Sequence, residues 1–195
     1  MKSFRVKSKW IIGLSGSMLS GKSTALAYFA ACGADTISCD EIAQKLRTRP
    51  AVRKKIYAAV GTAQTYQLAA LVFNNRPKHK KIEQILHPLI LKEVRAQIKK
   101  SKARLVVVEA PLLFEAGWDQ WTDLNIVVLA DPKTLPARLK ARKFTQAEYD
   151  RRMKFQLPEA QKVKRADVVF FHATKAQLKK SVERFCKVLE VLPHQ

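Results

Sequence analysis

The stretch GSMLSGKST near the start of the chain has the residue types and spacing of a phosphate-binding loop. It fits the pattern G-x-x-x-x-G-K-[ST], and a short apolar run precedes it as a strand would. Two glycines permit backbone conformations that point successive amide hydrogens at phosphate oxygens, and a helix that begins here adds its positive dipole end. We therefore expect nucleotide phosphates to contact Gly16, Ser17, Met18, Leu19, Ser20, Gly21, Lys22, Ser23 and Thr24.

Two side chains of this loop could take part in phosphoryl transfer. Lys22 can reach the β- and γ-phosphates of a nucleoside triphosphate as a point charge, and the Ser23 hydroxyl can bind the Mg2+ that bridges them. The alternative is an ordinary turn between a strand and a helix. That alternative requires two glycines, a lysine and a serine to coincide at these offsets by chance.

The elements that must position this loop are those of a doubly wound α/β fold. Short continuous apolar runs are typical of buried parallel strands, and helical segments separate them here. Such a sheet binds ligands at the carboxyl ends of its strands, where Gly16, Asp40 and Glu109 would meet. We expect five parallel strands, at residues 10–14, 105–108, 124–129 and 168–171 and, more weakly, 36–38.

Helical sequence interrupts the strand pattern between residues 41 and 103. Apolar residues there follow helical spacing at Ile82, Ile85, Leu86, Leu89 and Ile90. Pro88 suggests that the helix is interrupted there, because proline is favoured in the first turn of a helix. His87 would then be a helix-boundary residue. We expect a helical insertion that binds an acceptor.

A second helical tract, residues 134–164, contains several arginines and few large apolar side chains. Arg138 and Arg142 are one helical turn apart and would project to the same side. We expect a short basic lid over the site, with Arg151, Arg152 and Gln156 as weaker contributors. The remaining residues, 1–40, 104–133 and 165–195, would form the nucleotide-binding core.

The composition limits the class of protein. A chain of 195 residues suits one α/β domain. Its net charge of +21 attracts polyanions but does not indicate which polyanion binds. The basic clusters lack interleaved aromatic residues, so we expect no specific nucleic-acid partner. No apolar run is long enough for a membrane span or a signal peptide. The three cysteines have no C-x-x-C pair, which favours the cytoplasm over a disulfide-forming compartment and gives no zinc site.

A phosphate loop occurs in hydrolases, motors, switches and small-molecule kinases alike, so other features must decide between them. The short chain, the helical insertion and the basic lid favour a kinase that encloses a small acceptor. Enclosure matters because water would otherwise compete as the phosphoryl acceptor.

The sequence resembles the dephospho-coenzyme A kinase family over nearly the whole chain after Lys9. The resemblance rests on the tracts GLSGSMLSGKST, CGADTISCDEIAQ, LVFNN, IEQILHPLI, VVVEAPLLFEAG and RADVVF. It implies a P-loop kinase that uses ATP and Mg2+ to phosphorylate the ribose 3′-hydroxyl of dephospho-coenzyme A, giving coenzyme A and ADP. This is the last step of coenzyme A biosynthesis.

The resemblance also implies roles for residues outside the loop. Asp40 would lie near the acceptor hydroxyl, although an aspartate there could instead cap a helix that begins at Glu41. Glu109 could hold a water of the magnesium shell or could be an ordinary carboxylate at a strand end. Lys22, Arg138 and Arg142 would stabilise the transferred phosphoryl group. The acceptor would contact His87, Pro111, Leu112, Leu113 and Glu115, although the apolar residues of this set, with Phe114, could equally pack in the core.

Four positions depart from the family pattern: Ser38, Gln44, Leu135 and His172. They affect the acceptor contact, the lid and the adenine pocket, and leave the loop and Asp40 unchanged. Two alternatives therefore stay open. One is another P-loop small-molecule kinase, such as a nucleoside monophosphate kinase, and the other is a nucleotide-dependent nucleic-acid-binding protein without enzymatic activity. The sequence does not indicate an oligomeric state.

Overall fold

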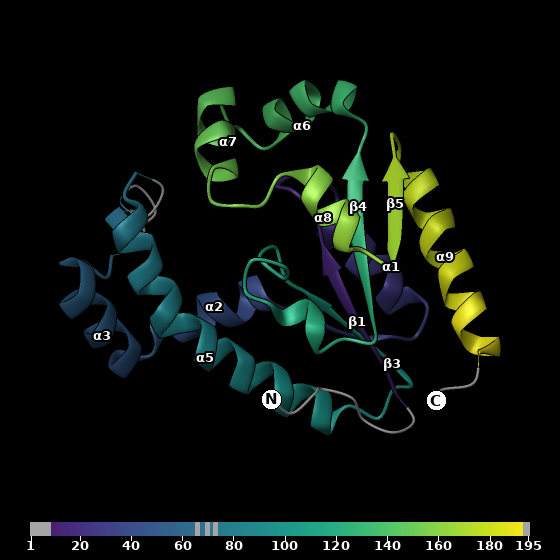
Figure 1. Cartoon of the computed structure of the whole chain (residues 1–195), viewed down its shortest axis with the longest axis horizontal. Helices are drawn as coiled ribbons and strands as arrows, with labels where there is room; N and C mark the ends of the chain where they lie inside the picture. The colour runs from purple at the N-terminus through teal and green to yellow at the C-terminus, as the bar shows by residue number, and fades with distance from the viewer. Residues whose placement is uncertain (1–8, 65–66, 69–70, 72–73, 193–195) are drawn as a thin grey trace.

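A computed structural model of the chain describes residues 9–64, 67–68, 71 and 74–192, so part of the LVFNN tract lies outside the described residues. Five parallel strands form one sheet in the order β2-β3-β1-β4-β5 (Figure 1). Their bounds are β1 (Trp10–Ser15), β2 (Asp35–Ser38), β3 (Leu105–Glu109), β4 (Leu124–Ala130) and β5 (Val168–His172). The sheet confirms the expected fold class, including the weakest of the predicted strands.

Helices cover both faces of the sheet. One face packs against α1 (Lys22–Ala31) and α9 (Lys175–Val191), and the other against α2 (Cys39–Thr48) and α5 (Arg76–Lys100) (Figure 1). Helix α3 (Pro50–Val60) packs against α2 and α5. Successive strand residues point to opposite faces. Ile12 accordingly joins the core beside α1 and α9, whereas Ile11 joins the core beneath α5. Apolar side chains on both faces explain why the strands read as continuous apolar runs.

Helix α5 is one continuous helix of 25 residues, and the expected break at Pro88 is wrong. Proline removes one backbone hydrogen bond and costs about 3 kcal/mol inside a helix. The buried residues of α5 recur every four positions on both sides of Pro88, from Ile82 to Ile98. Burial of this stripe in the core offsets the lost bond. His87 is therefore a mid-helix residue.

The predicted lid contains three short helices, α6 (Leu135–Ala141), α7 (Gln146–Met153) and α8 (Glu159–Arg165). The first two lie beyond the carboxyl end of β4, while α8 packs against that strand (Figure 1). The described residues also include two 3-10 turns, η1 (Trp118–Gln120) and η2 (Pro132–Thr134). Within the described residues, no helix has the length and apolar character needed to cross a bilayer.

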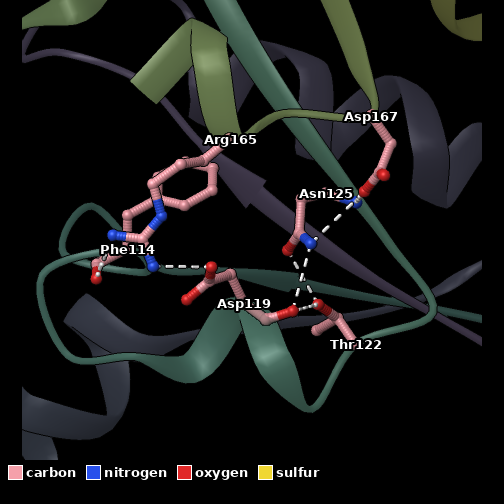
Figure 2. A network of polar contacts seen from close by, with 6 residues as sticks. All are labelled: Phe114, Asp119, Thr122, Asn125, Arg165 and Asp167. Carbon is pink, nitrogen blue, oxygen red and sulfur yellow. Dashed lines mark hydrogen bonds and ion pairs between the residues drawn. The ribbon is translucent and has the colours of Figure 1, made fainter. Parts of the chain in front are cut away.

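A polar network anchors the loop between β3 and β4 (Figure 2). The Arg165 guanidinium pairs with Asp119 at 2.6 Å, and Asn125 on β4 donates its side-chain amide to the Asp119 carbonyl at 3.1 Å. The members of the network are Phe114, Asp119, Thr122, Asn125, Arg165 and Asp167. It ties the segment after β3 to the end of α8 and the start of β5, so that this segment forms a fixed wall of the site.

Candidate active site

The loop between β1 and α1 requires glycine at both glycine positions of the G-x-x-x-x-G-K-[ST] pattern. Gly16 has φ +149° and Gly21 has φ +103°, a region that side chains disfavour. A Cβ atom on Gly16 would lie 2.4 Å from the Val128 carbonyl oxygen, and one on Gly21 would lie 2.9 Å from Nε2 of His172. At both positions the loop backbone packs too closely against Val128 or His172 to admit a side chain. Helix α1 begins directly after Gly21.

Lys22 is folded over this loop. Its Nζ atom donates to the Ser17 carbonyl oxygen at 2.8 Å, and only 8% of the residue is exposed. Burial lowers the pKa of Lys22 to about 8, against the opposing effect of Glu109. The buried hydroxyls of Ser17 and Ser20 have no hydrogen-bond partner in the described part of the chain. A cation and unpaired donors around one backbone cradle suit phosphate oxygens.

An oxygen pair lies at the start of α1. The Ser23 hydroxyl donates to the Glu109 carboxylate at 3.1 Å. The parallel register places Glu109 opposite Leu14 and Ser38, which brings it to the loop. Burial raises the pKa of Glu109, while Lys22 and the Ser23 hydroxyl oppose the rise. A hydroxyl and a carboxylate beside a phosphate cradle are the ligands that Mg2+ takes in nucleotide sites.

Asp40 does not cap α2, so the alternative structural role for this residue is wrong. The helix begins at Cys39, and the cap is Ser38, whose hydroxyl accepts from the Glu41 backbone amide. This hydrogen bond also gives Ser38, a departure from the family pattern, a local role. The Asp40 side chain is left to face the site near Lys22 and Glu109, whose pKa values it affects.

One cavity of about 1000 Å³, here called the central cavity, joins these groups. Its walls come from the loop, α2, α5, the segment after β3 and the lid. Most residues predicted from the sequence line it: Met18, Leu19, Gly21, Lys22, Ser23, Thr24, Asp40, His87, Glu109, Pro111, Leu112, Arg138 and Arg142. Residues that sequence reasoning missed also line it, among them Ala43, Arg47, Leu68, Trp118 and Phe155.

His87 enters the central cavity from the middle of α5. Its ring packs edge-on against Trp118 at 5.5 Å between centroids, and its Nε2 atom lies 3.9 Å from the Glu83 carboxylate. Burial lowers the pKa of His87 in spite of that carboxylate. Burial therefore favours the neutral imidazole, which can offer one donor and one acceptor to a ligand.

Two residues of the predicted acceptor wall lie elsewhere. Leu113 is 1% exposed and packs in the core against Gly13. Glu115 accepts from the Leu157 backbone amide at 2.7 Å and pairs with Lys162 at 3.3 Å. Neither lines the central cavity, so the structure argues against direct contact of either residue with the acceptor. The turn after β3 points Leu112 outward and Leu113 inward, which the sequence pattern could not show.

The sequence does not reveal Lys162, because nothing in the tract AQKVKR distinguishes it from the exposed Lys164 and Arg165. The structure buries it completely, at 0% exposed. Its ammonium donates to the Pro111 carbonyl at 3.1 Å and to the Gln156 side chain at 3.0 Å, and it pairs with Glu115. Lys162 thus joins α8 to the wall of the central cavity.

We expect Lys162→Ala to lower the free energy of unfolding by about 3 kcal/mol, because it leaves the Glu115 carboxylate without its cation. Lys164→Ala removes the same charge from an exposed position of the same helix and should change stability by less than about 0.5 kcal/mol. Urea denaturation of both variants provides the measurement. Equal effects would show that the buried pair contributes nothing specific.

The lid contributes arginines to the central cavity. Arg138 on α6 donates from Nη1 to the Leu19 carbonyl of the phosphate loop at 2.9 Å, and Arg142 ends the same helix. Both line the cavity, as does Arg152, whose guanidinium lies 4.5 Å from the centre of the Phe144 ring. Cations on the lid therefore face the loop that would hold the donor phosphates.

His172, at the end of β5, supports the loop from behind. Its Nε2 atom lies 2.8 Å from the Ser20 carbonyl oxygen, and the residue is 3% exposed. A carbonyl oxygen only accepts, so Nε2 carries the proton in this contact. This departure from the family pattern thus adds a contact to the loop.

Comparison with known proteins decides the family. The family model described as dephospho-CoA kinase matches residues 10–177. The chain belongs to the dephospho-CoA kinase family. Dephospho-CoA kinase of Fusobacterium nucleatum is 31% identical over 189 residues, which cover 92% of this chain and 98% of that protein. Dephospho-CoA kinase of Geobacillus kaustophilus is 38% identical over 172 residues, covering 81% and 85%.

A solved structure shows the same architecture. A Thermus thermophilus protein has a TM-score of 0.82 and 28% sequence identity, with 96% of this chain and 100% of that chain covered. Membership of the dephospho-CoA kinase family makes this chain an ATP-using phosphotransferase on the P-loop kinase scaffold. The phosphate loop predicted from the sequence therefore belongs to a kinase.

Proposed function

We propose that the protein transfers the γ-phosphoryl group of ATP to the ribose 3′-hydroxyl of dephospho-coenzyme A, releasing coenzyme A and ADP. One observation supports this most directly. Lys22 of the phosphate loop and Asp40 line one cavity that is large enough for a nucleotide-containing acceptor. A donor phosphate on the loop and a hydroxyl beside Asp40 would then face each other across the cavity.

The donor side consists of the loop and its neighbours. The backbone amides of residues 16–21 and the Lys22 ammonium would hold the β- and γ-phosphates. Ser23 and Glu109 would hold Mg2+, which when bound neutralises charge between the phosphates. From the lid, Arg138 and Arg142 would neutralise the negative charge that develops on the transferred phosphoryl group.

The acceptor side consists of α2, α5 and the wall after β3. The Asp40 carboxylate would orient the hydroxyl and accept its proton as the new oxygen–phosphorus bond forms. His87 would donate or accept one hydrogen bond, and Pro111 and Leu112 would provide the wall. We further propose that residues 41–103 form the acceptor-binding part and residues 134–164 the lid. Because α8 packs on β4, closure would involve α6 and α7.

We place the reaction in the cytoplasm. The three cysteines, Cys32, Cys39 and Cys186, are free thiols, which fits a reducing compartment.

The test is ATP-dependent formation of coenzyme A from dephospho-coenzyme A, followed by chromatography and by phosphorus NMR of the 3′-position. We expect product only with ATP and Mg2+ together. A parallel series supplies nucleoside monophosphates, and we expect these to react at less than about 1% of the rate, since they lack most of the acceptor's binding groups. Preferred phosphorylation of a monophosphate would instead identify a different small-molecule kinase. ATP binding without turnover of any acceptor, with salt-sensitive binding to RNA, would favour a nucleic-acid-binding role.

A further inference from the structure

A second cavity, of about 600 Å³, lies between the insertion and the lid and is here called the outer pocket. It is lined by Asn74, Arg76, Arg151, Lys154 and Phe155. Three of these five side chains are cations, and no acidic residue of the described chain lines the pocket. Glu148, the acidic residue one turn before Arg151, is engaged in the capping box with Thr145. The pocket therefore presents positive charge to its interior.

The outer pocket continues the central cavity. Phe155 lines both, and its ring stacks on His79 at 4.3 Å between centroids. Along α5, three residues of one helical face line the central cavity, namely His79, Glu83 and His87. Arg76 lies one turn beyond His79 on that face, about 16 Å along the axis from His87. A single extended ligand could thus contact both cavities.

A hydrogen bond joins the two sides of the outer pocket. The Arg76 guanidinium donates from Nη2 to the Lys154 carbonyl at 3.3 Å, which joins the start of α5 to the end of α7. The side chains of Arg151 and Lys154 are exposed, and within the described residues neither forms an ion pair with a carboxylate. Their charges are available to a ligand.

We propose that the outer pocket binds the diphosphate of the acceptor, an inference that rests on the proposed function. The reaction brings together two molecules that each carry linked phosphates. The phosphate loop would hold those of ATP, so those of dephospho-coenzyme A would bind to cations outside the loop. Arginine and lysine at the outer pocket provide it, and arginine can bind phosphate through two parallel hydrogen bonds. The pocket discriminates dephospho-coenzyme A from adenosine, which carries no phosphate.

The test compares the dissociation constants of dephospho-coenzyme A and adenosine, measured by calorimetry on the full chain. Arg151→Gln and Lys154→Gln each remove one charge and keep the backbone contact of Arg76. We expect each to weaken dephospho-coenzyme A binding about tenfold and to leave adenosine binding unchanged. Lys180→Gln, an exposed position on α9 across the sheet, is the matched control and should change neither constant.

Equal weakening for both ligands would mean that the substitutions distort the cavity, and unchanged binding of dephospho-coenzyme A would mean that its diphosphate lies elsewhere. Either result overturns the proposal. Turnover is scored separately in the native protein. If it forms no coenzyme A but its dephospho-coenzyme A binding depends on Arg151 and Lys154, the proposed reaction fails while the diphosphate site stands.

Discussion

Lys22→Met should lower kcat/KM for ATP about a thousandfold while the protein stays folded. The variant removes the point charge that would meet the β- and γ-phosphates and keeps the length of the side chain. Stability should not fall, because burial already disfavours the Lys22 charge, as its lowered pKa shows. Initial rates over a range of ATP concentrations and a thermal melt of the same samples give the two quantities.

Lys55→Met, which removes an exposed charge from α3, is the control and should keep native kinetics. The pH dependence provides an independent check. In the free protein Lys22 loses its proton as pH rises through about 8, so kcat/KM for ATP should decline above that pH in the native enzyme. Lys22→Met has no such group and should lack the decline. A native-like rate in Lys22→Met would remove the lysine from the mechanism.

The sheet and the loop could be predicted because each depends on local sequence. Strands buried on both faces leave continuous apolar runs, and the loop needs glycine where φ is positive or space is short, as at Gly16 and Gly21. The carboxyl-end rule then placed Asp40 and Glu109 at one edge. These predictions needed no knowledge of how distant segments pack.

The features that escaped prediction depend on such packing. Pro88 sits inside a helix because the core beneath α5 outweighs a local preference. The turn after β3 places Leu112 at the central cavity and Leu113 in the core. Lys162 is buried only because α8 packs against the wall after β3. The outer pocket likewise forms where α5 meets α7, from cations that look like ordinary surface charge in a chain of net charge +21.

Asp40→Asn should lower kcat by about a hundredfold to ten-thousandfold, with little change in KM for ATP. Asparagine keeps the shape of the side chain but loses the charge that would orient the acceptor hydroxyl and take its proton. The loss should fall on kcat because Asp40 would act on the acceptor during transfer, whereas the loop and Lys22 hold the donor. Rates at saturating ATP and dephospho-coenzyme A measure it.

The neighbouring residue provides a close control for this substitution. Glu41→Gln also removes one negative charge from the first turn of α2, so it has the same effect on the helix dipole. Its rate should stay within about twofold of the native rate. Ser38→Ala removes the helix cap and should cost about 1 kcal/mol of stability without a comparable loss of kcat. If Asp40→Asn lost no more activity than Glu41→Gln, Asp40 would be an ordinary first-turn carboxylate, and the proton would have to pass to another group or directly to solvent.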